Sequence, residues 1–197
     1  MTIYTKQTDP NVFGFGILIP EKYYSYIQRY RKELLPYVDW FVKRRKYTNN
    51  EMGPHITIKY LGYHKDYSNQ EIKKRIPELR EICKRYLPFE IKVNGIGVKK
   101  INNRISIFLK FKPKLKLKEF HNEVLRLKGI DLFLDIDAEN YDPHIAIATA
   151  EWNKENWKRI GQIIKKHKKD KSIRVLCNDA YIFFKKKGTV IIYSSVI

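Results

Sequence analysis

The sequence predicts an α+β fold in which two interleaved lobes form one unit over residues 1–197. Patterns typical of strands and of helices alternate in both halves of the chain. No low-complexity linker separates the halves, and 43% of the residues are hydrophobic, which is enough for a substantial core. One short pattern, a proline, a histidine and then alternating apolar residues, occurs once in each half, at 54–58 and at 143–147.

The first half is expected to contain two strand and helix pairs. The elements are a strand at 12–19, a helix at 23–35, a strand at 55–61 and a helix that runs from 69 towards 86. Pro20 and Pro36 end the first two elements, because proline cannot continue a strand ladder or a helix. Ser68 and Glu71 have the spacing of a capping box, which predicts the start of the last helix.

The second half repeats this order and adds two hairpins. The elements are a hairpin of 89–98 with 105–111, a helix at 116–127, a strand at 144–148, a helix at 154–166 and a final hairpin of 175–184 with 190–196. Lysines at every second position from Lys110 to Lys118 would line one edge of an extended segment, but Pro113 argues against one unbroken strand there.

The charge is strongly positive, with 40 Lys and Arg against 21 Asp and Glu, a net charge of +19. Such a charge attracts polyanions, so nucleic acid or another phosphorylated ligand is the expected partner class. The alternative is a surface of solvated lysines of the kind found in thermophile proteins. Basic clusters at 43–46, at 99–100 with Arg104, and at 185–187 are expected to frame a cleft.

The remaining composition narrows the class of protein. No run of about 18 apolar residues occurs, and residues 1–10 lack the features of a signal peptide, so we expect a cytoplasmic protein without a membrane partner. Cys83 and Cys177 stand alone, without metal-ligand or redox spacing, and are expected to be free structural thiols.

The two Pro-His segments carry the candidate chemistry. In a strand, side chains alternate between faces, so His55, Thr57 and Lys59 share one face while Ile56 and Ile58 point to the core. By the same alternation His144, Ala146 and Ala148 share a face, and Thr149 lies opposite unless a bulge turns it. A lone histidine on a strand is more often structural than catalytic, but its recurrence in a matching context favours an acid–base pair.

Imidazole has an ordinary pKa of about 6.5, so near neutral pH one ring can accept a proton while another donates one. No acidic or cysteine side chain shares either motif face, so we expect no metal and no other cofactor. The other histidines lack such a setting: His64 is expected near the cleft rim, and His121 and His167 are expected to be solvated on basic helices.

The segment 54–62, Pro-His-Ile-Thr-Ile-Lys-Tyr-Leu-Gly, resembles the first signature of the two-histidine (2H) phosphoesterases, which include LigT-like 2'-5' RNA ligases and RNA 2',3'-cyclic phosphodiesterases; 143–147 resembles the second. The resemblance implies two pseudo-symmetric βα-rich lobes with antiparallel sheets facing a central cleft. It implies that His55 and His144 are the catalytic acid and base, that no metal is needed, and that Thr57 binds the phosphate. Ala146 departs from the family, which carries Thr or Ser there, and 148–150 lacks the basic residue that many members carry.

The implied substrate is RNA or a nucleotide with a cyclic phosphate or a 2'-5' linkage, bound by a monomer. Lys59 and Arg104 are candidates to replace the missing phosphate contacts, although an ordinary solvated cation is an equal alternative for each. Tyr63 is the aromatic candidate for stacking on a base, with three others to consider. These others are Phe15, Tyr141 and Tyr181.

Two other functions remain open at this point. The first is an RNA- or nucleotide-binding module in which Ala146 marks weakened catalysis. The second is a hydrolase of a small cyclic nucleotide or oligonucleotide, for which the large positive charge is only partly relevant. The salt dependence of binding separates the second from an RNA enzyme, because a long RNA contacts many cations.

Overall fold

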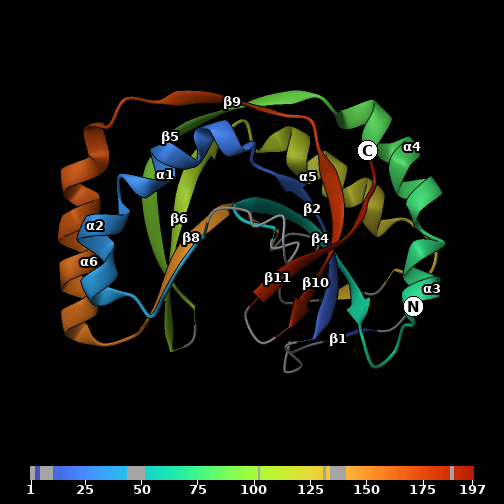
Figure 1. Cartoon of the computed structure of the whole chain (residues 1–197), viewed down its shortest axis with the longest axis horizontal. Helices are drawn as coiled ribbons and strands as arrows, with labels where there is room; N and C mark the ends of the chain where they lie inside the picture. The colour runs from blue at the N-terminus through green and yellow to red at the C-terminus, as the bar shows by residue number, and fades with distance from the viewer. Residues whose placement is uncertain are drawn as a thin grey trace.

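The computed structural model describes residues 3–4, 11–43, 52–101, 103–130, 132–133, 141–186 and 189–197. Within these residues, nine strands form one sheet in the order β11-β10-β2-β4-β8-β6-β5-β9, with β3 beside β8. The strands of this sheet pair antiparallel throughout. The sheet bends into an arch with the helices on its outer side (Figure 1). This large antiparallel sheet with helices confirms the predicted α+β class.

The sheet consists of two halves that meet at its centre. One half contains β11 (Thr189–Ser195), β10 (Ala180–Lys186), β2 (Val12–Leu18) and β4 (His55–Tyr63). The other contains β8 (Ile145–Glu151), β6 (Arg104–Lys112), β5 (Phe89–Ile101), β9 (Ile173–Cys177) and β3 (Trp40–Phe41). The pair Ile56 and Ile145 joins β4 to β8, so the two expected sheets are continuous at the residue after each motif histidine. A separate parallel pair is formed by β1 (Ile3–Tyr4) and β7 (Leu132–Phe133).

Two of the predicted helices, at 23–35 and at 69–86, are interrupted, whereas the helix predicted at 154–166 is confirmed with the same bounds. The helices are α1 (Tyr24–Gln28), α2 (Arg31–Leu34), α3 (Asn69–Lys73), α4 (Ile76–Tyr86), α5 (Leu115–Leu125) and α6 (Lys154–Lys166), with 3-10 turns at Glu21–Tyr23, Leu35–Tyr37 and His167–Lys169. The helix predicted from 69 to 86 is interrupted because Pro77 lacks an N–H and fits only the first turn of a new helix. The capping box of Ser68 and Glu71 is confirmed.

The helices cross between the halves of the sheet. The segment α1–α2 follows β2 in the chain but lies beside α6, on the side of β5, β6 and β8 (Figure 1). Conversely, α5 follows β6 but packs against α4 and β4. Each side of the arch is therefore covered by helices from both halves of the chain.

The prediction of one continuous strand at 175–184 is wrong. The chain leaves β9 at Cys177 and enters β10 at Ala180, and these strands lie in opposite halves of the sheet. Polar Asn178 and Asp179 separate them, and β9 pairs with β5 while β10 pairs with β2 and β11. The predicted hairpin itself is confirmed, because β10 pairs antiparallel with β11.

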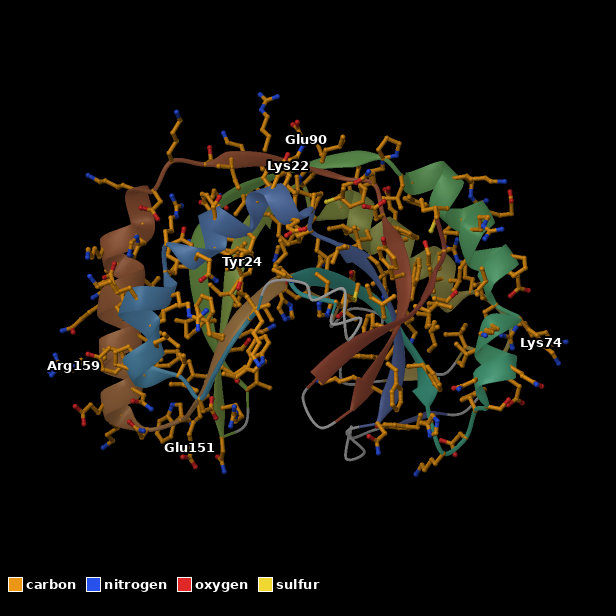
Figure 2. All side chains as sticks on the ribbon, viewed as in Figure 1. Lys22, Tyr24, Lys74, Glu90, Glu151 and Arg159 are labelled. Carbon is orange, nitrogen blue, oxygen red and sulfur yellow. The ribbon has the colours of Figure 1, made fainter. Side chains whose placement is uncertain are left out.

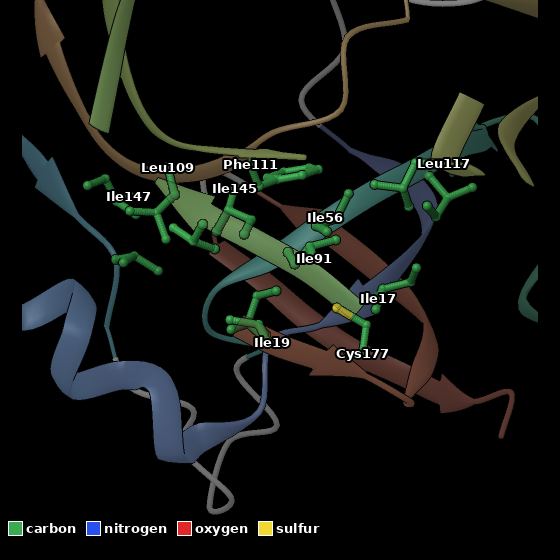
Figure 3. Close-up of a cluster of buried hydrophobic side chains, with 14 of the residues drawn as sticks. Ile17, Ile19, Ile56, Ile91, Leu109, Phe111, Leu117, Ile145, Ile147 and Cys177 are labelled. Carbon is green, nitrogen blue, oxygen red and sulfur yellow. The ribbon is translucent and has the colours of Figure 1, made fainter. Parts of the chain in front are cut away.

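The core lies between the sheet and the helices. Ile56, Ile58, Ile145 and Ile147 are all buried in it, as the alternation predicts. Figure 3 shows Ile56 and Ile145 next to each other among side chains from both halves of the sheet. Since the isoleucines point to the helices, the residues between them face the concave side of the arch.

The outer surface carries many of the charged side chains, such as Arg159 on α6 and Lys74 after α3, which project from opposite sides of the molecule (Figure 2). In the described parts of the chain, no helix is both long and apolar enough to cross a membrane. Cys83 and Cys177 are free and buried, as predicted, and burial raises the pKa of each thiol to about 12. Of the predicted basic clusters, Arg44, Arg45, Lys46 and Lys187 lie outside the described residues.

Candidate active site

The two motif histidines are held in the same way. The Nδ1 atom of His55 lies 2.9 Å from the carbonyl oxygen of Gly53. The Nδ1 atom of His144 lies 2.8 Å from the carbonyl oxygen of Asp142. In both cases the partner stands two residues upstream, across the motif proline. Because a carbonyl can only accept, Nδ1–H donates in both rings, and Nε2 is the nitrogen that gains or loses a proton.

The pairing of β4 with β8 brings the motifs together. Ile56 pairs with Ile145, and continuing this antiparallel register by one residue in each direction puts His55 opposite Ala146 and Thr57 opposite His144. These four residues occupy one face of the sheet, with the histidines on the diagonal. Diagonal neighbours in such a pair lie about 7–8 Å apart. The charge of a protonated His144 is also among the causes that lower the pKa of His55.

Each motif strand contains a β-bulge at the same place. In β4, Thr57 pairs with Gly16 and Lys59 with Phe15, so Ile58 is the extra residue. In β8, Ala146 pairs with Phe108 and Ala148 with Ile107, so Ile147 is the extra residue. A bulge shifts the alternation of the residues that follow it. The two halves of the site are thus related by pseudo-symmetry down to single backbone irregularities.

The bulges correct two predictions from alternation. Lys59 pairs with the core residue Phe15 and is 1% exposed, so it does not share the face of His55 and Thr57. Ala148 likewise turns to the core, where it is buried opposite Ile107. The bulge in β8 instead turns Thr149 to the motif face, since Thr149 pairs with Ser106 rather than with a core residue.

Arg104 lies beside Thr149 on this face. Its Nη2 atom donates to the hydroxyl oxygen of Thr149 at 2.8 Å, and its Nη1 atom lies 2.7 Å from the carboxylate of Asp39. The guanidinium is about half exposed. Arg104 therefore places a guanidinium beside Thr149 on the motif face.

The surroundings of both histidines favour their neutral form. Burial lowers the pKa of His55 to about 4, with further lowering by Lys185 and His144. Burial also lowers the pKa of His144, and Lys99 and Lys114 add to this effect, while the Asp142 carboxylate and the carbonyl hydrogen bond oppose it. Cations therefore stand near both rings, as a site for an anion requires.

Asp142 holds the two cations near His144. Lys114 is hydrogen-bonded to its carboxylate, and the Nζ atom of Lys99 lies 3.9 Å away. Burial opposes ionisation of Asp142, but the lysines outweigh it and lower its pKa. Lys99 pairs with Ser106 across the sheet and so lies on the motif face, with its Nζ atom 5.7 Å from the centre of the Phe108 ring.

An aromatic ring stands beside each histidine. The ring centre of Phe183 lies 5.2 Å from that of His55, and the ring centre of Phe108 lies 5.7 Å from that of His144. Both rings lie over glycines of a neighbouring strand: Phe183 over Gly14, and Phe108 over Gly97. Neither ring is among the site residues predicted from the sequence. Glycines inside predicted strands were the available signal, because they permit a close approach of another group.

Other predicted positions lie elsewhere. Tyr63 is 2% exposed and packs beside Val12, so its ring offers no face to a base. Phe15 and Tyr141 are also buried, whereas Tyr181 is partly exposed and pairs with Gly16. His64 is exposed and lies against Phe13 and Phe184.

Two histidines expected to be solvated are not. His121 is 1% exposed and stacks on Tyr141, because α5 packs onto β4. His167 is largely buried, with its two ring nitrogens 2.9 and 3.0 Å from the carboxylates of Glu33 and Asp170. No group of three potential metal ligands among His, Cys, Asp and Glu is found over the described residues.

The chain resembles known proteins in its sequence profile and in its fold. The sequence profile of the 2'-5' RNA ligase superfamily matches residues 20–186. No curated protein matches the chain. Among solved structures, E. coli LigT in apo form is similar with a TM-score of 0.55 and 16% identity, covering 95% of each chain. E. coli LigT complexed with 3'-AMP is similar with a TM-score of 0.53 and 15% identity, covering 95% of this chain and 97% of that one.

Usb1 from Kluyveromyces marxianus, solved with uridine monophosphate, is similar with a TM-score of 0.51 and 10% identity, covering 92% of this chain and 97% of that one. At these identities the structural likeness shows a shared fold, and the profile match extends over most of the sequence. The chain therefore belongs to the 2'-5' RNA ligase superfamily, whose two-histidine phosphoesterase fold it has.

Proposed function

We propose that this chain is an RNA phosphoesterase that uses His55 and His144 as general acid and base, without a catalytic metal. Its substrates are RNA ends with a 2',3'-cyclic phosphate or 2'-5' linkages, and the ligation reaction is the reverse of the same chemistry. The observation that carries the proposal is the matched pair of Nδ1 hydrogen bonds to Gly53 and Asp142, which makes Nε2 the reactive nitrogen of both rings. The nucleotides in the LigT and Usb1 structures support this substrate class.

The two imidazole rings and one water molecule account for every bond and proton of the hydrolysis. The neutral histidine takes a proton from water at Nε2, and the water oxygen attacks phosphorus. The bond from phosphorus to the 3' oxygen breaks, and the protonated histidine gives its Nε2 proton to that oxygen. The products are a 3'-hydroxyl and a 2'-phosphate. The site is close to symmetric, so either histidine fits either role.

The charges around the rings fit this scheme. Without substrate, both pKa values are lowered, so both rings are neutral near pH 7. A bound phosphate brings negative charge and favours protonation of one ring, which creates the acid. Lys185 on one side and Lys99 with Lys114 on the other supply cations for that phosphate, and Thr57 supplies a hydroxyl.

The test is hydrolysis of an RNA oligomer that ends in a 2',3'-cyclic phosphate, measured with EDTA present. We expect the wild type to open the ring to a 2'-phosphate. His55→Ala and His144→Ala should each lose at least about 100-fold in rate, since a positioned acid or base contributes roughly that much. His64→Ala, which removes an exposed histidine outside the motifs, is the control and should keep the rate.

Two other outcomes of this assay would contradict the proposed function. Full activity in either motif variant would exclude the acid–base pair. Tight, salt-sensitive RNA binding without turnover would favour a binding module. This is the strongest alternative function, because Ala146 lacks the hydroxyl expected in the second motif.

A further inference from the structure

The bulge in β4 is held by two buried side chains. The Nδ1 atom of His121, on α5, lies 2.7 Å from the carbonyl oxygen of Ile58, the extra residue of the bulge. The hydroxyl of Tyr141 donates to the carbonyl oxygen of Thr57 at 3.0 Å. Two successive carbonyls next to the motif hydroxyl are thus satisfied from outside the strand, where a bulge disrupts the regular ladder.

The matching bulge in β8 is held differently. The carbonyl oxygen of Ile147, which corresponds to that of Ile58, accepts from the backbone N–H of Val42 at 2.7 Å. This bond comes from the chain directly after β3, which pairs with β8 at Phe41 and Trp40. The second motif is therefore fixed by backbone pairing, whereas the first is fixed by an imidazole and a phenol at the equivalent place.

His121 and Tyr141 form one unit. Their rings are nearly parallel, with an interplanar angle of 8° and centres 4.0 Å apart. The two residues are 1% and 8% exposed. Two rings stacked in the core have little freedom to move independently, so the two hydrogen bonds to β4 constrain each other.

Tyr141 also connects this unit to the second motif. It stands three residues before His144 and directly before Asp142, whose carbonyl accepts from the His144 ring. The hydrogen bond from Tyr141 to Thr57 therefore ties the segment that orients His144 to the strand that carries His55. Thr57 and His144 each adjoin a member of the pair Ile56 and Ile145, which joins β4 to β8.

We propose that His121 and Tyr141 are positioning residues that set the distance and angle between the two motif histidines. The catalytic role of the histidines themselves rests on the function proposed above. A misplacement of about 1 Å between reacting groups can reduce a rate by about 100-fold, so a buried link of this kind matters for turnover.

The first arm of the test separates positioning from binding. Tyr141→Phe keeps the stacked ring but removes the bond to Thr57, and should lower kcat about tenfold while KM changes less than twofold. His121→Leu should lower kcat by a similar factor. His121→Asn, whose amide can donate from nearly the place of Nδ1, should restore most of it. Val124→Ala, also on α5 and fully buried, is the control that lowers Tm but should keep kcat.

The second arm needs no substrate. NMR titration of the His144 and His55 side-chain signals reports their surroundings directly, and Tyr141→Phe should move the pKa of His144 upward as its buried position loosens. Unchanged kcat together with an unchanged His144 titration in Tyr141→Phe would overturn the inference. If the wild type has no phosphoesterase activity, the proposed function fails, and the titration alone then decides for or against the positioning role.

Discussion

The two motif histidines are equivalent in sequence but have different neighbours. Lys185 and the His144 charge add to burial in lowering the pKa of His55 to about 4. At His144 the Asp142 carboxylate opposes burial and the two lysines. A group whose pKa is lowered on folding binds its proton first in the unfolded chain, which links these rings to stability in acid.

The first prediction concerns this linkage. The pKa of His55 is about 4 in the folded chain and about 6.5 in the unfolded chain, so between these pH values the unfolded state binds more protons. The contribution of His55 to the free energy of unfolding is therefore full above pH 6.5 and is lost as the pH falls towards about 4. We expect His55→Gln to remove about 2–3 kcal/mol of the loss that the wild type shows between pH 7 and pH 4.5. Urea unfolding at both pH values measures it, with His64→Gln as the control. An equal loss in wild type and His55→Gln would show that His55 is not buried in its neutral form.

The second prediction concerns Ala146. This residue follows Ile145, the partner of Ile56, and lacks the hydroxyl that Thr57 has at the same place of the first motif. Restoring a donor to an anionic group contributes about 1.5–3 kcal/mol at best. Ala146→Thr should therefore keep or raise kcat/KM for the cyclic phosphate substrate, by up to about 100-fold. Ala146→Val has the same shape without the hydroxyl, and an equal gain with valine would rule out the hydroxyl as the cause.

At the scale of elements, the site depends on how closely the strands and their side chains approach. Phe183 on β10 reaches across β2 to His55 only because Gly14 leaves space. A Cβ atom built on Gly14 would lie 2.2 Å from the Phe183 ring, a distance that real atoms do not adopt. The glycine therefore allows the ring to flank the histidine.

This packing predicts opposite effects of one substitution at two glycines. Gly14→Ala should displace the Phe183 ring, lower the Tm and reduce phosphoesterase activity, and adding Phe183→Leu should recover part of the stability but not the activity. Gly161→Ala in α6 meets nothing within 4 Å and should stabilise by up to about 1 kcal/mol. Thermal unfolding and the RNA assay measure both. A stable, active Gly14→Ala variant would mean that the ring does not support the site.

The pairing of elements also shows where prediction from sequence failed. Residues 173–184 have an almost continuous strand pattern, yet the chain divides it between β9 and β10 in opposite halves of the sheet. The pattern of a strand depends on which face is buried and not on which neighbour pairs with it, so it could not reveal the division. The capping box at Ser68, a purely local signal, was predicted correctly.

At the scale of the whole molecule, the net charge of +19 distinguishes between substrates of different length. Each phosphate that a cation neutralises releases counterions, so affinity for a long RNA falls steeply as salt rises. A ligand with one or two phosphates has a shallow dependence.

This gives the last prediction. The slope of log K against log salt should be several times steeper for a 20-nucleotide RNA than for a dinucleotide with a 2',3'-cyclic end, as measured by fluorescence anisotropy in the His144→Ala variant, which avoids turnover. Heparin, a polyanion without bases, is the competitor that reports charge alone. Equal slopes for the long and the short ligand would favour the hydrolase of a small cyclic nucleotide.

Local sequence patterns predict the candidate residues of each motif. Period-two alternation and the repeated Pro-His context predict His55, Thr57 and His144 as candidate site residues. They also predict that Ile56 and Ile145 face the core, which is confirmed, because alternation is a property of each strand alone. The groups that surround these residues depend on the tertiary fold. The bulges turn Lys59 inward and Thr149 outward, and His121 is buried behind the first motif, because register and packing depend on neighbouring strands and helices that come from distant parts of the chain.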